Sequence, residues 1–169
     1  APDGSYTVAK LVEDTSTSGH TGVGSYSPTV NESYNVSLYV KSAGNNRQLN
    51  VLGYYLAGYG YNNIVNPDTG TFTGSMPTGT SLNAVGNGWY RFSAPIVSGN
   101  STSFQLQLVN GGTATYTGDG TSGLYIWGLQ VTQGPALLQY SASGSTTVSY
   151  YTPKGLLIEG ATTNQTLYS

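Results

Sequence analysis

The sequence predicts an all-β protein, a jelly-roll β-sandwich of two antiparallel sheets with an extended C-terminal tail. Apolar and polar residues alternate along several runs, with the period of a strand. Helical periodicity is nearly absent, and 24 Gly among 169 residues would weaken any helix. Turn-forming sequences separate the runs at the short spacing that is typical of a sandwich.

The clearest alternation predicts a strand from Tyr34 to Lys41. Its Val36, Leu38 and Val40 share one face, and polar residues together with Tyr39 occupy the other. Similar patterns predict further strands at Tyr6–Val12, Leu49–Tyr55, Ser81–Val85, Trp89–Val97, Phe104–Leu108 and Leu124–Val131. About eight strands of this length are enough for two packed sheets with one core.

Short Gly- and Asn-rich sequences predict the turns between these strands. Residues 85–89, VGNGW, are typical of a tight hairpin, because Gly and Asn tolerate positive φ. Other turns are expected at residues 45–46, 66–70, 110–112 and 118–120. The strand pattern thins after Gln133, so we expect residues 1–133 to form the domain body and residues 134–169 an extended tail.

Charge and Cys content exclude several function classes. Charged residues make up only 7% of the chain, and the net charge is −2. Five cations, Lys10, Lys41, Arg47, Arg91 and Lys154, are too few for a nucleic-acid interface. The absence of Cys excludes a disulfide framework, and no apolar run is long enough for a membrane span. This composition fits a protein that acts outside cells, and the start at Ala1 suggests a processed product or a segment of something longer.

Four phrases resemble a known family: APDG (residues 1–4), VGNGWYR (85–91), YTGDGTSGLYIWGLQ (116–130) and GLLIEGATTN (155–164). They are similar to the carbohydrate-binding-module-like jelly-roll domains of tailed-phage virion proteins. Such domains occur in tail fibres, tail spikes, head fibres and capsid decorations. The resemblance covers most of the body, and its third and fourth phrases are the most specific.

The order of the phrases departs from that family. There, the LLIE phrase and the TN-x-x-LYS phrase usually precede the APDG phrase and supply the opening strand. Here residues 163–169, TNQTLYS, close the chain. The tail therefore either refills the missing strand of its own domain or completes the next copy at an open sheet edge. A boundary between two repeats, or a plain linker, are the alternatives.

Glycan binding requires aromatic faces for stacking and amides for bonding hydroxyls. The outward face of the paired strands offers Tyr39, Asn50, Tyr54, Gln105 and Gln107, with Arg47 near one end. The Tyr-rich stretch that follows adds Tyr59 and Tyr61, as sugar platforms or as contacts to a neighbouring subunit. The alternative is that these side chains only solvate an exposed sheet face. Trp89 and Trp127 are assigned to packing in the sheet interior.

Catalysis and metal binding are not predicted. The acidic residues lie mostly in turns or at strand ends, and no nucleophile elbow, phosphate loop or metal-ligand spacing is present. The resemblance implies a structural calcium, as in some related glycan-binding jelly rolls, and Asp3, Glu13 and Asp119 offer oxygen ligands that could converge. They form no regular ligand series, and turn capping explains Asp119, so no cofactor is predicted. His20, between two Gly-containing pairs, is expected to be an exposed loop residue.

These observations lead to one expected function and one alternative. We expect a non-enzymatic, extracellular virion surface protein that binds glycans and assembles with its own copies or other virion proteins, without a nucleic-acid or membrane partner. The alternative is a purely structural decoration, head-fibre or filament subunit. In that case the Tyr-rich surfaces and the tail make subunit contacts.

Overall fold

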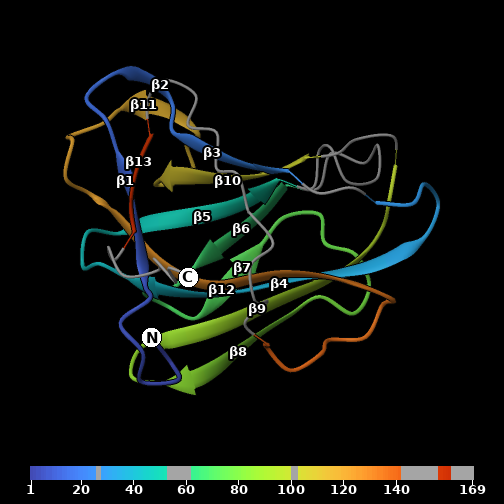
Figure 1. Cartoon of the computed structure of the whole chain (residues 1–169). Helices are drawn as coiled ribbons and strands as arrows, with labels where there is room; N and C mark the ends of the chain where they lie inside the picture. The colour runs from blue at the N-terminus through green and yellow to red at the C-terminus, as the bar shows by residue number, and fades with distance from the viewer. Residues whose placement is uncertain (26–27, 53–61, 100–102, 142–155, 161–169) are drawn as a thin grey trace, which may run out of the picture.

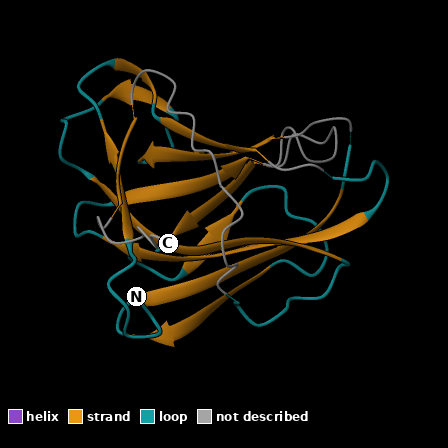
Figure 2. Ribbon diagram, in the orientation of Figure 1, coloured by secondary structure: helices purple, strands orange, loops and turns teal. Residues whose placement is uncertain are grey.

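The computed structural model describes residues 1–25, 28–52, 62–99, 103–141 and 156–160. It confirms the predicted all-β, jelly-roll-like sandwich: two antiparallel sheets pack against each other, and the described residues contain no helix (Figures 1 and 2). Accordingly, no helix among these residues has the length and hydrophobicity to cross a membrane.

The larger sheet has six strands in the order β13-β1-β12-β4-β9-β8. Their bounds are Leu156–Gly160 (β13), Ala9–Glu13 (β1), Gly123–Gln133 (β12), Ser33–Ser42 (β4), Trp89–Val97 (β9) and Ser81–Gly86 (β8). The longest strands, β12, β4 and β9, lie side by side in its centre. This sheet therefore has a long, continuous outer face.

The second sheet has five strands in the order β3-β10-β5-β6-β7. Their bounds are Thr21–Ser25 (β3), Ser103–Asn110 (β10), Arg47–Leu52 (β5), Asn62–Asn66 (β6) and Thr71–Thr73 (β7). A small pair, β2 (Thr17–Gly19) and β11 (Thr115–Thr117), forms a separate two-stranded sheet. The sequence did not predict β2, β3, β6, β7 or β11, because most are short and rich in small or polar residues. β13 is the LLIE phrase of the tail, which was expected to supply a strand to its own domain or to a neighbouring copy.

The core lies between the two large sheets and contains the apolar residues that the sequence alternation predicted to be buried. Val36, Leu38 and Val40 of β4 are buried there, and Leu49 and Leu108 of the five-stranded sheet pack in the same cluster. The predicted hairpin at residues 85–89 joins β8 to β9, and Gly86, Asn87 and Gly88 all have positive φ. The residues that alternate with these core positions face outward and form the candidate surfaces.

Both described parts of the predicted tail lie on the body. Residues 134–140 follow β12, and β13 pairs antiparallel with β1 of the same chain (Figure 1). The first predicted strand begins later than expected, at Ala9 instead of Tyr6. A turn precedes it, in which Gly4 N donates to Ala1 O and Ser5 N donates to the Asp3 carboxylate.

Candidate functional site

The predicted binding residues are divided between the two sheets. Asn50 lies on β5, and Gln105 and Gln107 lie on the neighbouring β10 of the five-stranded sheet. Tyr39 lies on β4 of the six-stranded sheet, where it alternates with the core residues Leu38 and Val40. The sequence predicted that Tyr39 shares a face with these amides. The structure shows instead that Tyr39 lies on the other sheet.

The amides form a row on the outer side of the five-stranded sheet. Asn50 is opposite Gln107 in the strand register, and its Nδ2 donates to Gln107 Oε1 at 3.3 Å. Ile64 follows on one side of this row and Thr21 on the other. Asn50 is buried, whereas Gln105 and Gln107 are half-buried. A neutral face with amide donors and acceptors can bond hydroxyl groups without a charge.

Tyr54, Tyr59 and Tyr61 lie outside the described residues. In the sequence they belong to the segment that joins β5 to β6, two neighbouring strands of the sheet that carries the amide row. Their role as sugar platforms or subunit contacts stays a prediction.

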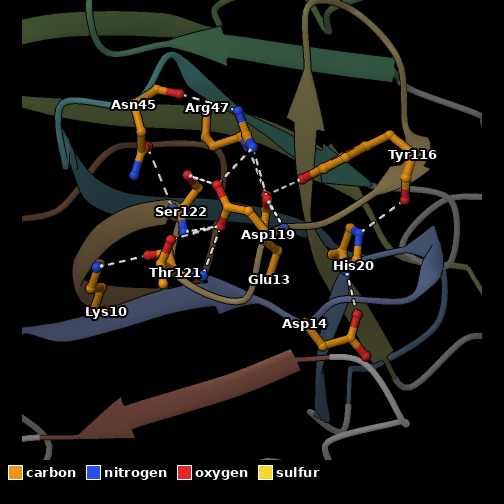
Figure 3. Close-up of polar contacts among 11 residues, drawn as sticks. Lys10, Glu13, Asp14, His20, Asn45, Arg47, Tyr116, Asp119, Thr121 and Ser122 are labelled. Carbon is orange, nitrogen blue, oxygen red and sulfur yellow. Dashed lines mark hydrogen bonds and ion pairs between the residues drawn. The ribbon is translucent and has the colours of Figure 1, made fainter.

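Arg47, predicted at one end of the binding face, forms a buried ion pair with Glu13 (Figure 3). Its Nε donates to Glu13 Oε2 at 2.6 Å and its Nη2 to Glu13 Oε1 at 2.8 Å. The hydroxyl of Tyr116 and the backbone N of Asp119 also donate to the Glu13 carboxylate. Since the Glu13 side chain is 0% exposed, this geometry is that of a structural charge cluster.

The pKa values in this cluster follow from its contacts. Burial alone would raise the pKa of Glu13, but hydrogen bonds from Arg47, Tyr116 and Asp119 outweigh burial and lower it. Burial and the hydrogen bond to Glu13 raise the pKa of the Tyr116 hydroxyl. Hydrogen bonds from Ser122 and Thr121 lower the pKa of Asp119. The two carboxylates therefore carry their charge at neutral pH, and Arg47 lies beside both.

Two of the three carboxylates considered for calcium do come together, but around a guanidinium. Arg47 Nη2 donates to Glu13 Oε1 and also lies 3.6 Å from Asp119 Oδ2. Asp119 also caps the turn that follows it, as predicted, by accepting from Thr121 N and Ser122 N. Asp3 caps a separate turn at Ser5. In the part of the chain that the structure describes, no group of three or more acidic or His side chains could hold a metal ion.

His20 is buried, so its expected position in an exposed loop was wrong. Its side chain is 0% exposed, and its Nδ1 lies 3.0 Å from the Asp14 carboxylate (Figure 3). Its Nε2 lies 3.2 Å from the backbone oxygen of Tyr116. His20 thereby links the strand pair β2–β11 to the rest of the body, a long-range contact that the flanking Gly residues do not reveal.

Trp127 was assigned to the sheet interior, but it lies on the outer face of the six-stranded sheet. It pairs with Tyr39 in the register, and the two ring centroids are 5.0 Å apart. The guanidinium of Arg91 lies 5.2 Å from the centroid of Tyr39. Trp127 and Trp89 are both buried, but neither belongs to the core cluster between the sheets. The cover over Trp127 comes from outside the two sheets.

Two segments contribute to that cover. Tyr140 of residues 134–140 lies against Trp127, and Thr7 Oγ1 accepts a hydrogen bond from Trp127 Nε1 at 2.9 Å. The alternation in the sequence also did not reveal that polar groups are buried on this face. Asn35, Ser37 and Ser93 face away from the core and are nevertheless buried. The alternation in β4 does place Asn35 and Ser37 on the outer face with Tyr39. Nothing in the pattern shows that a later segment covers them.

Comparison with models of known protein families gave no match, and comparison with curated protein sequences gave none either.

Proposed function

We propose that the chain is a non-enzymatic sugar-binding domain on the surface of a virion, acting outside cells and in several copies. The observation that carries this proposal is the neutral amide row of Asn50, Gln105 and Gln107 on the five-stranded sheet. In the sequence, the Tyr-rich segment lies between β5 and β6, which are neighbouring strands of this sheet. The virion assignment rests on the resemblance to phage jelly-roll domains.

A neutral ligand is favoured at the amide row because the row itself carries no charged side chain. Arg47, on the same strand as Asn50, is held by Glu13. Lys10 Nζ donates to the backbone oxygen of Thr121 at 3.1 Å. An anionic ligand would find little free positive charge here, whereas hydroxyl groups can bond to amides.

A binding role is also favoured by how the acidic side chains are used. Asp3, Asp14 and Asp119 accept hydrogen bonds from nearby backbone N–H groups, and Glu13 is held by Arg47. A glycosidase needs two carboxyl groups facing a sugar from opposite sides. These four carboxylates serve caps and an ion pair instead, which supports a protein that binds without chemistry.

A glycan array with the protein displayed in many copies tests this proposal, since weak sites gain strength from multivalency. We expect neutral glycans to bind the wild type. Gln107→Ala is expected to weaken that binding, because it removes an amide from the row. Gln133→Ala, which changes an exposed Gln at the end of β12, is the matched control and should bind like the wild type. No glycan bound in this format would contradict the proposal.

The position of β13 favours a second candidate, a structural subunit that assembles through its C-terminal strand. β13 is the edge strand of the six-stranded sheet and pairs with β1. The same edge of β1 could accept this strand from a second copy, by strand addition. If so, a chain ending at residue 155 should stay folded by circular dichroism but lose its assembly by light scattering. Loss of folding would instead indicate that the strand completes its own domain.

A further inference from the structure

We propose that the outer face of the six-stranded sheet is a second ligand site, for a neutral sugar ring, and that residues 134–140 close it. These residues are called the strap below. This site goes beyond the amide row, because it lies on the other sheet and is built from different residues. It contains Tyr39, the one described residue among the predicted binding residues that is neither in the amide row nor in the Glu13–Arg47 pair.

The floor of this site consists of two adjacent rows across strands β12, β4 and β9. In one row Trp127, Tyr39 and Arg91 are direct neighbours in the register. In the next, Gln130, Ser37 and Ser93 are neighbours in the same way. An aromatic row beside a row of amide and hydroxyl groups is the combination that recognises a sugar, which has an apolar ring face and polar edges.

The strap covers this floor with few contacts. Asn35 Nδ2 donates to Pro135 O at 3.1 Å, and Arg91 Nη2 donates to Leu138 O. The ring of Tyr140 lies 4.4 Å, centroid to centroid, from the ring of Trp127. The strap therefore presents two carbonyl oxygens and one aromatic ring to the floor, with that ring tilted by 57° to Trp127 and edge-on to Tyr39. A sugar presents the same kinds of group, hydroxyl oxygens and a ring face, and can take the place of the strap.

Gly128 allows Tyr140 to come this close. It lies at a bulge in β12 with a φ of 61°, and a side chain there would meet Tyr39 at 3.0 Å and Tyr140 at 3.2 Å. Burial, the Asp3 carboxylate and Tyr39 together raise the pKa of the Tyr140 hydroxyl.

Two buried polar atoms of the floor lack a hydrogen-bond partner in the part of the chain that the structure describes. Among the described residues, Arg91 Nε and Gln130 Oε1 are buried atoms for which no hydrogen-bond partner is found. Buried polar atoms are paired in most proteins, so a pair of exceptions on one face needs a reason. One atom is a donor and the other an acceptor, and a hydroxyl group can both accept and donate. A bound sugar can satisfy both atoms, which the strap does not.

The strap is also built to open. It contains no strand and is drawn as a loop after β12 in Figure 2. Its Leu137 and Leu138 are 38% and 50% exposed, so it covers the face without burying its own largest apolar side chains. A segment with few buried apolar contacts opens at low free-energy cost.

Isothermal titration of Tyr140→Ala with cellohexaose, maltohexaose and mannohexaose tests this inference. Removing the Tyr140 ring, which contacts both Trp127 and Tyr39, should raise the affinity for at least one of these probes about 2- to 12-fold over the wild type. Tyr140→Phe is the matched control, because it keeps the ring, and it should bind like the wild type. Near-ultraviolet circular dichroism checks that each variant is folded.

Two further variants locate the gain. In the Tyr140→Ala background, Arg91→Gln should remove the gain, because it changes the floor of the site. Gln107→Ala in the same background should leave the gain intact, since it changes only the amide row. The two double variants therefore distinguish a failure of the strap site from a failure of sugar binding at the amide row. A folded Tyr140→Ala protein with no gain for any probe, or a gain that survives Arg91→Gln, would overturn the inference.

Discussion

The Glu13–Arg47 cluster and the strap-covered face are built alike in one respect. In each, an arginine lies over a tyrosine ring: Arg47 is 5.4 Å from the centroid of Tyr116, and Arg91 is 5.2 Å from that of Tyr39. Arg47, however, is held by the buried carboxylate of Glu13. Arg91 meets a backbone carbonyl of the strap, and its Nε has no partner among the described residues. Arg47 is thus held within the fold by a carboxylate, whereas Arg91 keeps one donor without a partner among the described residues, as the proposed strap site requires.

Substitutions of these two arginines should therefore lower the free energy of unfolding by different amounts, and this is the largest difference we expect. Arg47→Met leaves the buried Glu13 carboxylate without its partner, and loss of one partner of a buried ion pair costs about 3–5 kcal/mol. Arg91→Met removes a cation–π contact and a hydrogen bond at a half-buried site and should cost about 1 kcal/mol. Urea unfolding of both variants measures the difference. Equal losses would mean that Arg91 is as structural as Arg47.

Substituting one glycine in each region should also lower the stability by different amounts. A Cβ at Gly118, beside the charge cluster, would lie 1.9 Å from Asp14 O and 2.9 Å from His20 Cε1. Gly118→Ala is expected to lower the free energy of unfolding by about 3 kcal/mol, because the backbone of Asp14 must move. Gly128→Ala meets only the side chains of Tyr39 and Tyr140 and should cost about 1–2 kcal/mol, chiefly from its positive φ. Thermal unfolding would contradict this comparison if Gly128→Ala were the more damaging.

Acid should destabilise the protein through the charge cluster. The pKa of Glu13 is lower in the folded protein than its usual 4.5, despite burial, because Arg47, Tyr116 and Asp119 donate to it. A carboxyl with a lowered folded pKa contributes stability above its unfolded pKa and loses it as the pH falls through the folded pKa. Stability should therefore fall below about pH 4.5, and Glu13→Gln should be less stable at pH 7 with a flatter acid limb. An unchanged acid limb in Glu13→Gln would exclude Glu13 as the cause.

The smallest effect on stability is expected at the strap. Tyr140→Ala removes its ring contact with Trp127, and such a contact is worth about 0.5–1.5 kcal/mol. Hydrogen exchange should nevertheless become faster in residues 134–140 and stay unchanged in β4 and β9. A large global loss of stability in this variant would show that the strap is part of the core fold.

The sequence predicted most of the central strands because their alternation is local. Val36, Leu38 and Val40 reveal their buried face within one strand, and the GNG turn reveals its hairpin within three residues. The Arg47–Glu13 pair joins residues 34 positions apart, and His20 meets the carbonyl of Tyr116 across 96. No local pattern indicates such contacts, so Arg47 was predicted to bind a ligand and His20 to be exposed.

The predicted binding residues turned out to lie on two different sheets, and the reason is again that alternation is a local pattern. Alternation shows that Tyr39 and Asn50 both point away from the core, but it does not show that their strands belong to different sheets. Likewise, the strap covers a face that was formed by strands far earlier in the sequence, as its contact with Asn35 shows.

The most direct test is a nuclear magnetic resonance titration of the wild type with the neutral oligosaccharides, observing side-chain amides and arginine Nε–H groups. The signals of Gln105 and Gln107 should shift if the amide row binds sugar, and the Nε–H of Arg91 should shift as the strap opens. The Nε–H of Arg47 should stay in place, because Glu13 already holds it. A shift at Arg47 with none at Arg91 or the amides would contradict the account.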